Sequence, residues 1–264
     1  MEVSRLFYYP VKSLGVVETN QLDVTAWGPD RDRRLMLVDE NGKFVTQRQH
    51  NEMALMKTED DGKTLTFKNG PETFTLPWPD FSLDGAQKNV RVWDDEVAGS
   101  LVSPEADQWF SKQLNRPVSL VYMSDDTTRQ VDLEFAQKGD KTGFSDGFPF
   151  LLISEASLAF LQEELPFELT MNRFRPNIVV KGCEAFAEDR WKRIAINGID
   201  FEIVKSCSRC AIPTINPETA ERQPEVMKVL VKHRKQGNKV FLGQNLIHRG
   251  QGFITVGDDV QLLD

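Results

Sequence analysis

Asn-Gly and Asp-Gly pairs between alternating apolar residues constrain the fold of this chain more than any other feature. Such pairs stand within residues 34–46, 55–76 and 193–205, with apolar and polar residues alternating on both sides. These dipeptides favour the tight turns that join two antiparallel strands. We therefore expect a mainly β protein of the α+β class, antiparallel or nearly so, with one more hairpin at 252–263.

Three segments carry helix start signals. Ser103 followed by Pro104 is typical of an N-cap and a first helical position, which predicts a helix over 104–115. Ser154 caps a second expected helix over 155–165, and Pro224 opens a third that runs to residue 234. Helices are thus few in a chain made mostly of strands.

The stretch 123–147 is polar, acidic and poorly periodic, which is typical of a linker or a mobile loop. A domain boundary is therefore expected near residue 125. We expect a β-rich N-terminal domain over 1–125 and a C-terminal β-barrel with helical insertions over 126–264.

The three cysteines are too few, and too odd in number, for the disulfide framework of a secreted protein. The first residues lack the basic and apolar regions of a signal peptide, so we expect a cytoplasmic protein. No apolar run is long enough to span a bilayer, and the net charge of −8 argues against nucleic acid or an anionic membrane as a partner. Any basic cluster must therefore be local.

Cys207 and Cys210 lie two residues apart in "CSRC", and this spacing alone fits several kinds of site. A thioredoxin-like redox centre would place the motif at a helix N-terminus, but the prolines that follow Cys210 oppose a helix. Structural zinc needs four ligands, whereas the remaining candidates (Cys183, His50, His233 and His248) have no finger-like spacing. A third interpretation is that both thiols are small buried side chains at a strand end, above all Cys207.

A set of short motifs in a familiar order resembles the MOSC-domain proteins, over essentially the whole chain. Within that family the likeness is to the N-hydroxylaminopurine-resistance reductases and the mitochondrial amidoxime-reducing components. The motifs are "YPVKS" (9–13), "SEASL" (154–158), "NRFRPNIVV" (172–180), "AEDRW" (187–191), and "CSRC" (207–210) followed by "NPETA" (216–220).

The resemblance implies a MOSC N-terminal domain followed by the MOSC barrel, with a pyranopterin molybdenum cofactor bound by its phosphate and pterin. It also implies that the second cysteine of "CSRC", Cys210, is the thiolate ligand of the metal. A thiolate is a soft ligand, which suits a metal already bound by dithiolene sulfurs. Lys205, Arg209 and Arg175 are the cations expected to favour its charged form, although Lys205 also fits an ordinary solvated side chain.

An anionic phosphate needs a concentrated positive field in a protein of this charge. Lys12 and Ser13 of "YPVKS" offer an ammonium, a hydroxyl and a backbone N–H, and the family pattern points to Arg33 as the phosphate clamp. Arg48 is a further candidate pterin contact that fits a surface role equally well. The neighbouring arginines, Arg31 and Arg34, are expected at the surface.

Asp146 in "FSDGFPF" matches a Ser-Asp stretch that lies beside the cofactor in the family. Gly147 and Phe148 depart from the small hydroxyl pair of the mitochondrial proteins, so the resemblance implies no pterin contacts from these two positions. Asn177 fits either a hydrogen bond to the pterin edge or a structural position in the turn after Pro176.

The resemblance implies two-electron reduction of N-hydroxylated compounds: hydroxylaminopurines, hydroxylamines and amidoximes. The three scattered histidines have no part in this expectation, and His233 and His248 are expected at the surface. Three cysteines cannot build an iron–sulfur cluster, so either a ferredoxin-like domain lies outside this sequence or electrons come from a separate flavoprotein or ferredoxin. The alternative is a non-catalytic protein that carries molybdenum cofactor or sulfur.

Overall fold

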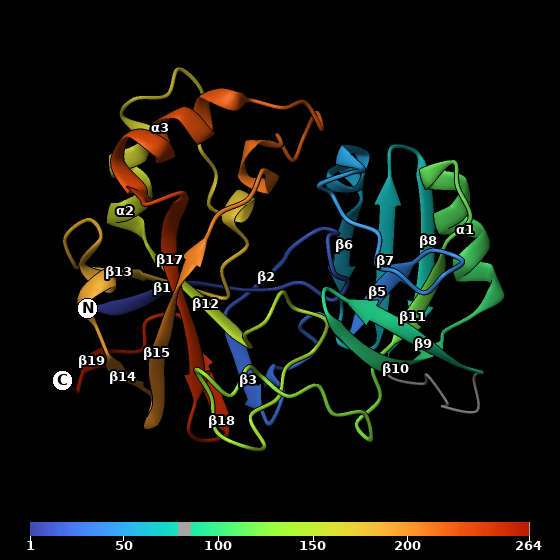
Figure 1. Cartoon of the computed structure of the whole chain (residues 1–264), viewed down its shortest axis with the longest axis horizontal. Coiled ribbons are helices and arrows are strands. Elements are labelled where there is room, and N and C mark those ends of the chain that lie inside the picture. Colours follow the sequence, from blue (N-terminus) through green and yellow to red (C-terminus); the bar gives the residue numbers. More distant parts are fainter. Residues whose placement is uncertain (79–85, 264) are drawn as a thin grey trace.

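The computed structural model describes residues 1–78 and 86–263, and its strands form two assemblies that lie side by side (Figure 1). One assembly, with α2 and α3 above it, is built mostly from the C-terminal half of the chain. The other holds two small sheets and α1. The mainly β, α+β class expected from the turn pattern is confirmed.

The larger assembly is a nine-stranded sheet in the order β19-β14-β15-β17-β12-β13-β1-β2, with β16 paired to β17. Its two ends approach each other, because Val3 N donates to Asp258 O and Val260 N donates to Met1 O, each over 2.9 Å. The strands are β1 (Glu2–Tyr8), β2 (Val17–Thr19), β12 (Phe150–Ser154), β13 (Ile178–Lys181), β14 (Arg193–Ile196), β15 (Ile199–Ser208), β16 (Lys235–Gln236), β17 (Lys239–His248) and β19 (Val260–Leu262).

Strand pairing in this sheet is antiparallel except between β12 and β13. The Asn-Gly signal at 197–198 forms the predicted turn between β14 and β15, and both residues have positive φ, 47° and 75°. That conformation suits Asn and Gly because their side chains meet little steric hindrance there. Apolar side chains such as Phe150, Phe201 and Leu246 fill the interior.

The second assembly comprises a four-stranded sheet, β5-β11-β10-β9, and a three-stranded sheet, β6-β7-β8. Phe67 on β7 and Phe110 on α1 meet edge to face in the core between them. The expected turns at Asp61-Gly62 and Asn69-Gly70 join β6 to β7 and β7 to β8. The bounds are β5 (Leu35–Val38), β6 (Lys57–Asp60), β7 (Thr64–Asn69), β8 (Glu72–Pro77), β9 (Gln87–Val92), β10 (Asp95–Leu101) and β11 (Ser119–Tyr122).

The three predicted helices are confirmed as α1 (Pro104–Leu114), α2 (Glu155–Gln162) and α3 (Pro224–Arg234). Ser103 Oγ accepts from Ala106 N, and Ser154 Oγ accepts from Ser157 N, as N-caps do. Short 3₁₀ turns occupy η1 (Asn51–Leu55), η2 (Met171–Phe174), η3 (Ala187–Arg190) and η4 (Ile212–Thr214). No described helix is long and apolar enough to cross a membrane.

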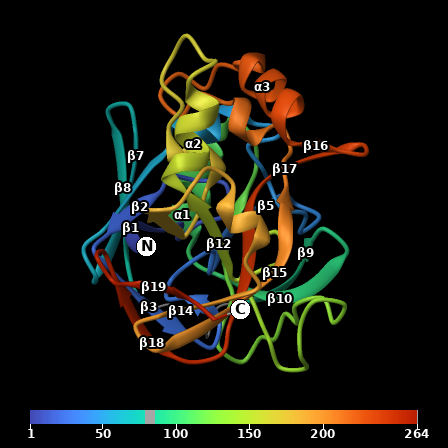
Figure 2. The same cartoon turned by 90° about the vertical axis from the view of Figure 1, so that its left-hand side faces the viewer.

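The hairpin expected at 252–263 is wrong. Its first strand, β18 (Gly252–Thr255), pairs with β3 (Gln21–Thr25), which also pairs with β4 (Gly28–Pro29), whereas β19 pairs with β14. Figure 2 shows these strands at the end of the barrel opposite α2 and α3. Both segments of alternating residues form strands, but each strand pairs with one far away in the sequence.

The polar stretch 123–147 has no helix or named strand, yet its backbone is tied down. Arg129 is 4% exposed and donates to the carbonyls of Gly143 and Ser145. The expected mobile loop is therefore an irregular but anchored segment. The boundary at residue 125 stays a prediction. Two strands from the first 30 residues pair with strands of the C-terminal half: β1 pairs with β13, and β3 pairs with β18. The short strands β2 and β4 pair with β1 and β3.

Candidate functional site

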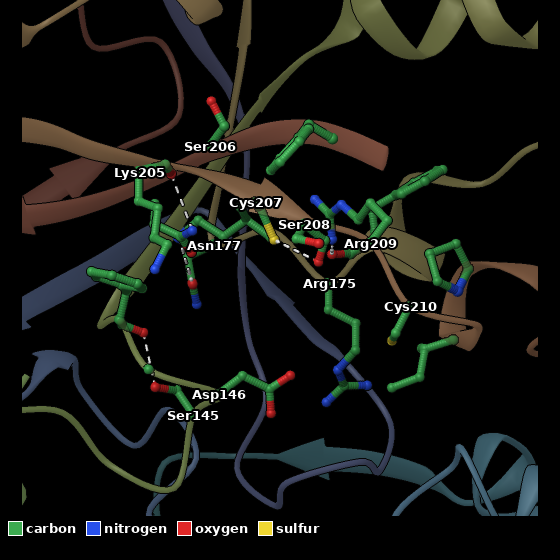
Figure 3. A pocket seen from close by; sticks show the side chains of 18 of the residues that line it. Ser145, Asp146, Arg175, Asn177, Lys205, Ser206, Cys207, Ser208, Arg209 and Cys210 are labelled. Atoms are coloured by element: carbon green, nitrogen blue, oxygen red, sulfur yellow. Dashed lines mark hydrogen bonds between the residues drawn. The ribbon is translucent and has the colours of Figure 1, made fainter. Parts of the chain in front are cut away.

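A cleft of about 270 Å³ lies where the two assemblies meet. The end of β15, the loop before β12 and the turn before β13 line it, together with three short segments of the N-terminal half. Figure 3 shows side chains from separate segments, among them Asp146, Arg175 and Cys210, extending into the same space. All eight site residues expected from the sequence line this cleft: Lys12, Ser13, Arg33, Arg48, Asp146, Arg175, Asn177 and Cys210.

Cys210 follows the end of β15, and the chain then enters the 3₁₀ turn η4 rather than an α-helix. This geometry lacks the helix N-terminus that activates thioredoxin-like thiols. Arg48 Nε donates to Cys210 Sγ over 3.3 Å, so a fixed cation faces the sulfur. Burial of Arg48 opposes its charge, but Asp146 and Cys210 outweigh burial and raise the pKa of the guanidinium.

Cys207, on β15 itself, also lines the cleft. Burial raises the pKa of its thiol, although Arg209 opposes the shift. A thiol with a raised pKa stays neutral at pH 7, so Cys207 is less suited than a thiolate to bind a metal. The third cysteine, Cys183, packs against the barrel core.

Lys12 and Asp146 form an ion pair on the wall of the cleft, with Lys12 Nζ 2.6 Å from Asp146 Oδ1. Lys12 is 4% exposed and also donates to Phe144 O. Burial lowers the pKa of Lys12 to about 8, although Asp146 opposes the shift. Desolvation works against the charge of Asp146, but Lys12 and Arg48 outweigh it and hold the pKa of that carboxyl well below its usual range.

Arg33 is engaged mainly with its own neighbour. Its Nη1 donates to both carboxylate oxygens of Asp32, at 2.8 and 2.7 Å, and the Asp32 side chain is 3% exposed. Burial raises the pKa of Asp32, although Arg33 opposes the shift. Arg33 Nη2 donates to the Arg175 carbonyl. The guanidinium therefore neutralises a buried carboxylate, which leaves it fewer free donors for a ligand than the sequence suggested.

Asn177 joins three segments behind the cleft and is 1% exposed. Its amide nitrogen donates to Phe7 O and Asp32 Oδ1, and its oxygen accepts from Leu151 N and Arg33 Nη1. Both donors and the acceptor are thus used inside the protein. Of the two roles left open by the sequence, these contacts match the structural one.

Ser13, Arg33 and Arg175 all have positive φ, between 47° and 67°, although none is glycine. Non-glycine residues occupy this region rarely, and such positions gather at functional sites where the surroundings fix them. The guanidiniums of Arg33 and Arg175 both lie over the ring of the buried Tyr9, at 4.2 and 4.1 Å. Burial, reinforced by Arg33, lowers the pKa of Arg175 to about 10.

Three buried guanidinium nitrogens of residues that line the cleft have no hydrogen-bond partner among the described residues: Arg173 Nε, Arg175 Nη2 and Arg209 Nη2. Arg175 Nη1 donates to Leu14 O, and Arg209 donates to the carbonyls of Leu242 and Phe174. Arg175 and Arg209 are therefore both held in place while Nη2 stays unused. A buried donor without a partner is costly, which indicates that a ligand supplies the acceptor.

Sequence reasoning considered Arg209 only as a cation near the thiols and missed its free donor. Its place within "CSRC" was the available signal, because the residue between two cleft cysteines at a strand end is carried to the same cleft. Among the described lining residues, eight are lysine or arginine and one is acidic. The cleft is therefore a local positive field on a protein with a net charge of −8.

Two expectations about nearby arginines need correction. Arg34 is 7% exposed, not a surface residue, and it donates to Met123 O and Asp125. Arg31 is partly buried and pairs with Asp60, whose side chain is fully buried. Both extend into the protein because a carboxylate or carbonyl there offers a partner, which the sequence alone does not reveal.

The histidines lie outside the cleft, as expected, but His248 is partly buried rather than at the surface, and its ring meets Phe150 edge to face. His233 is partly exposed and contacts Glu164. Within residues 1–78 and 86–263, no three His, Cys, Asp or Glu side chains gather where they could hold a metal ion.

Comparison with known proteins covers nearly the whole chain. The model of the MOSC N-terminal beta barrel domain matches residues 1–117, and that of the MOSC domain matches residues 139–261. The chain is 32% identical to mitochondrial amidoxime-reducing component 1 of Homo sapiens, over 99% of this chain and 82% of that protein. It is 33% identical to mitochondrial amidoxime reducing component 2 of Rattus norvegicus, over 98% and 82%. A solved structure, the YuaD protein of Bacillus subtilis, is 12% identical, with a TM-score of 0.44 over 98% of this chain and 93% of that one.

Proposed function

The chain belongs to the MOSC-domain family, and we propose that it is a molybdenum-cofactor-dependent reductase of N-hydroxylated compounds. The observation that carries this proposal is that one cationic cleft holds Cys210 together with three buried guanidinium nitrogens that have no partner among the described residues. An anion with several oxygen acceptors satisfies the nitrogens, and a soft metal matches the sulfur. The residues present therefore fit a phosphate-bearing, thiolate-ligated molybdenum cofactor.

Each wall of the cleft has a distinct task in this proposal. Arg175 Nη2 and Arg209 Nη2 bind the anionic part of the cofactor, and Lys12 keeps Asp146 charged and in place. Cys210 supplies the thiolate ligand, while Arg48 donates to its sulfur and orients it. Arg33 donates to the backbone carbonyl of Arg175 and so holds Arg175 in place. Arg33 is therefore a positioning residue more than a residue that binds the phosphate itself.

When bound, the molybdenum cofactor supplies a two-electron couple, so that R–NHOH takes up two electrons and two protons and leaves as R–NH2 and water. The protein's own contribution is to bind and orient in a cleft of fixed charges, which need little reorganisation during reaction. We propose further that electrons come from outside this sequence, through a ferredoxin-like domain or a separate flavoprotein or ferredoxin, because the three cysteines of this sequence cannot hold an iron–sulfur cluster.

Turnover tests the proposal. Protein loaded with molybdenum cofactor and supplied with reduced methyl viologen is expected to convert 6-hydroxylaminopurine to adenine and benzamidoxime to benzamidine, whereas NADH or NADPH alone supports neither reaction. The matched control is Cys210→Ser loaded in the same way. Loaded protein that keeps molybdenum but reduces neither compound would mean that the chain is a cofactor carrier and not a reductase.

A further inference from the structure

Trp93 differs from the other tryptophans in its exposure. The chain has five tryptophans, and Trp27, Trp78, Trp109 and Trp191 are each no more than 9% exposed. Trp93 is 44% exposed. A single exposed apolar side chain is ordinary by itself, so the backbone and the neighbours of this indole decide whether it has a role.

The backbone at Trp93 is also unfavourable for a bulky side chain. Val92 pairs with Asp95 at the end of the β9–β10 hairpin, so Trp93 and Asp94 form a two-residue turn. Trp93 has φ of 57°, a value at which this turn position prefers glycine. An aromatic residue in the left-handed region carries strain, and strained positions concentrate where a side chain must be presented for function.

This turn carries the indole to the rim of the cleft. The closed end of the β9–β10 hairpin points toward the barrel half (Figure 1). Trp93 Nε1 donates to Asp146 Oδ1 over 3.3 Å, and the Arg48 guanidinium lies 4.6 Å from the indole centroid. Because the same guanidinium contacts the Cys210 sulfur, the indole lies within roughly 10 Å of that sulfur.

The contacts of Trp93 fix the orientation of its ring. Phe44 meets it edge to face at 5.1 Å, Arg48 lies against it, and Asp146 accepts from its N–H. A ring held from three directions and still 44% exposed has lost most of its rotational freedom before any ligand arrives. Preorganised aromatic faces bind other planar rings well, because little further entropy is lost on stacking.

We propose that Trp93 is a specificity-determining residue of the cleft, a platform on which the planar ring of an aromatic N-hydroxylated substrate stacks. The inference rests on the proposed function, and it adds that substrates with a purine or phenyl ring are preferred over those without one. Stacking on an indole involves only the face of the substrate ring and does not depend on the N-hydroxyl group, so purines and phenyl amidoximes can both stack there.

Substrate kinetics give the first test, with two replacements of Trp93. Trp93→Gly removes the ring and places the residue that the turn prefers, so folding is preserved, while Trp93→Phe keeps an aromatic face. We expect Trp93→Gly to raise KM for 6-hydroxylaminopurine by about 5- to 100-fold with kcat little changed, and Trp93→Phe to recover most of the loss. KM for hydroxylamine, which has no ring, stays within about twofold of the parent value.

The matched control is Phe253→Ala, because Phe253 is also an exposed aromatic, 47% exposed, and lies on β18 away from the cleft. It should leave both KM values unchanged. If Trp93→Gly raises KM for 6-hydroxylaminopurine and for hydroxylamine by the same factor, then Trp93 only supports Arg48 and Asp146, and the stacking platform is rejected.

Binding without turnover separates this inference from the proposed function. In cofactor-loaded protein without a reductant, 6-hydroxylaminopurine and adenine should both quench tryptophan fluorescence, and Trp93→Phe should remove this quenching because the other four tryptophans are buried. Quenching through Trp93 without any turnover would keep the platform and reject the reductase. Turnover with unchanged KM and no quenching through Trp93 would reject the platform and keep the reductase.

Discussion

Arg48 Nε donates to Cys210 Sγ over 3.3 Å, although 162 residues separate them in the chain. The same guanidinium donates through Nη2 to Asp146, at 2.8 Å. One arginine from the N-terminal half thus connects the two residues of the barrel half that the family pattern places beside the cofactor. The site is therefore assembled only when both halves are folded and in contact.

Arg48→Ala should reduce catalysis without preventing folding. The variant removes a donor from the sulfur and one of two cations from Asp146, and a hydrogen bond to a charged group contributes about 1.5–3 kcal/mol. We expect kcat/KM with methyl viologen as donor to fall about 10- to 100-fold. The kcat/KM of Arg48→Lys should lie between those of the parent and Arg48→Ala, because lysine keeps the positive charge but lacks the several donors of the guanidinium. Full activity in Arg48→Ala at normal molybdenum content would remove Arg48 from the site.

Arg209→Lys should weaken retention of the cofactor. The substitution keeps a positive charge but loses the guanidinium nitrogen Nη2, which has no partner within residues 1–78 and 86–263. We expect the molybdenum content after gel filtration to fall about tenfold or more relative to the parent, because a charge-assisted bond is lost. Arg193→Lys is the control, because Arg193 is an exposed arginine outside the cleft that pairs with Asp200, and this variant should retain full content. Equal molybdenum content in the Arg209 variant and this control would show that Nη2 does not bind the cofactor.

Arg33→Ala should destabilise the cofactor-free protein. The carboxylate of Asp32 stays buried after Arg33 is removed, and breaking a buried pair from one side costs about 3–5 kcal/mol. The free energy of unfolding, measured with urea, is expected to fall by this order. Adding Asp32→Asn to Arg33→Ala should restore part of the loss, because the stranded charge is gone. If the urea midpoint of unfolding is the same in Arg33→Ala and the parent, Arg33 does not stabilise the fold, and binding of the phosphate is its main role.

Stability of the cofactor-free protein should rise with pH through Lys12. Burial lowers the pKa of Lys12 from 10.5 to about 8, although Asp146 opposes the shift. Between pH 8 and 10.5 the unfolded chain therefore binds more protons at Lys12 than the folded chain, and the free energy of unfolding increases with pH. We expect the free energy of unfolding of the parent, minus that of Lys12→Met, to increase with pH between 8 and 10.5, because the variant lacks the titrating group. A difference between the two proteins that is constant or decreases over this window would contradict the buried, charged lysine.

Most of the fold was predictable because its signals are local. The turns at Asn197-Gly198 and Asn69-Gly70 and the caps at Ser103 and Ser154 each depend on a few adjacent residues. The pairing of β18 with β3 was not predictable, because alternation identifies a strand but not its partner. Partners far apart in the sequence are fixed by the packing of the whole barrel.

All eight residues named from the sequence line one cleft, and five of them stand in the family motifs: Lys12, Ser13, Arg175, Asn177 and Cys210. That they bind a cofactor stays a prediction. Their individual contacts were less predictable than their place in the cleft. Arg33 and Asn177 turn toward Asp32, a buried carboxylate whose burial no local pattern marks, while Arg209 keeps an unused donor. The exposure of Trp93 was equally hidden, because a hairpin that places tryptophan where glycine is preferred gives no turn signal.

In the proposed function Cys210, and not Cys207, is the metal ligand. X-ray absorption at the molybdenum edge of cofactor-loaded protein counts the sulfur neighbours of the metal directly, in the parent, Cys210→Ser and Cys207→Ser. Cys207→Ser should match the parent and keep a substantial fraction of its turnover, whereas Cys210→Ser should have one sulfur neighbour fewer and no turnover. A Cys210→Ser protein with the parent's number of sulfur neighbours, or a sulfur lost from Cys207→Ser instead, would contradict the assignment of Cys210 as the ligand.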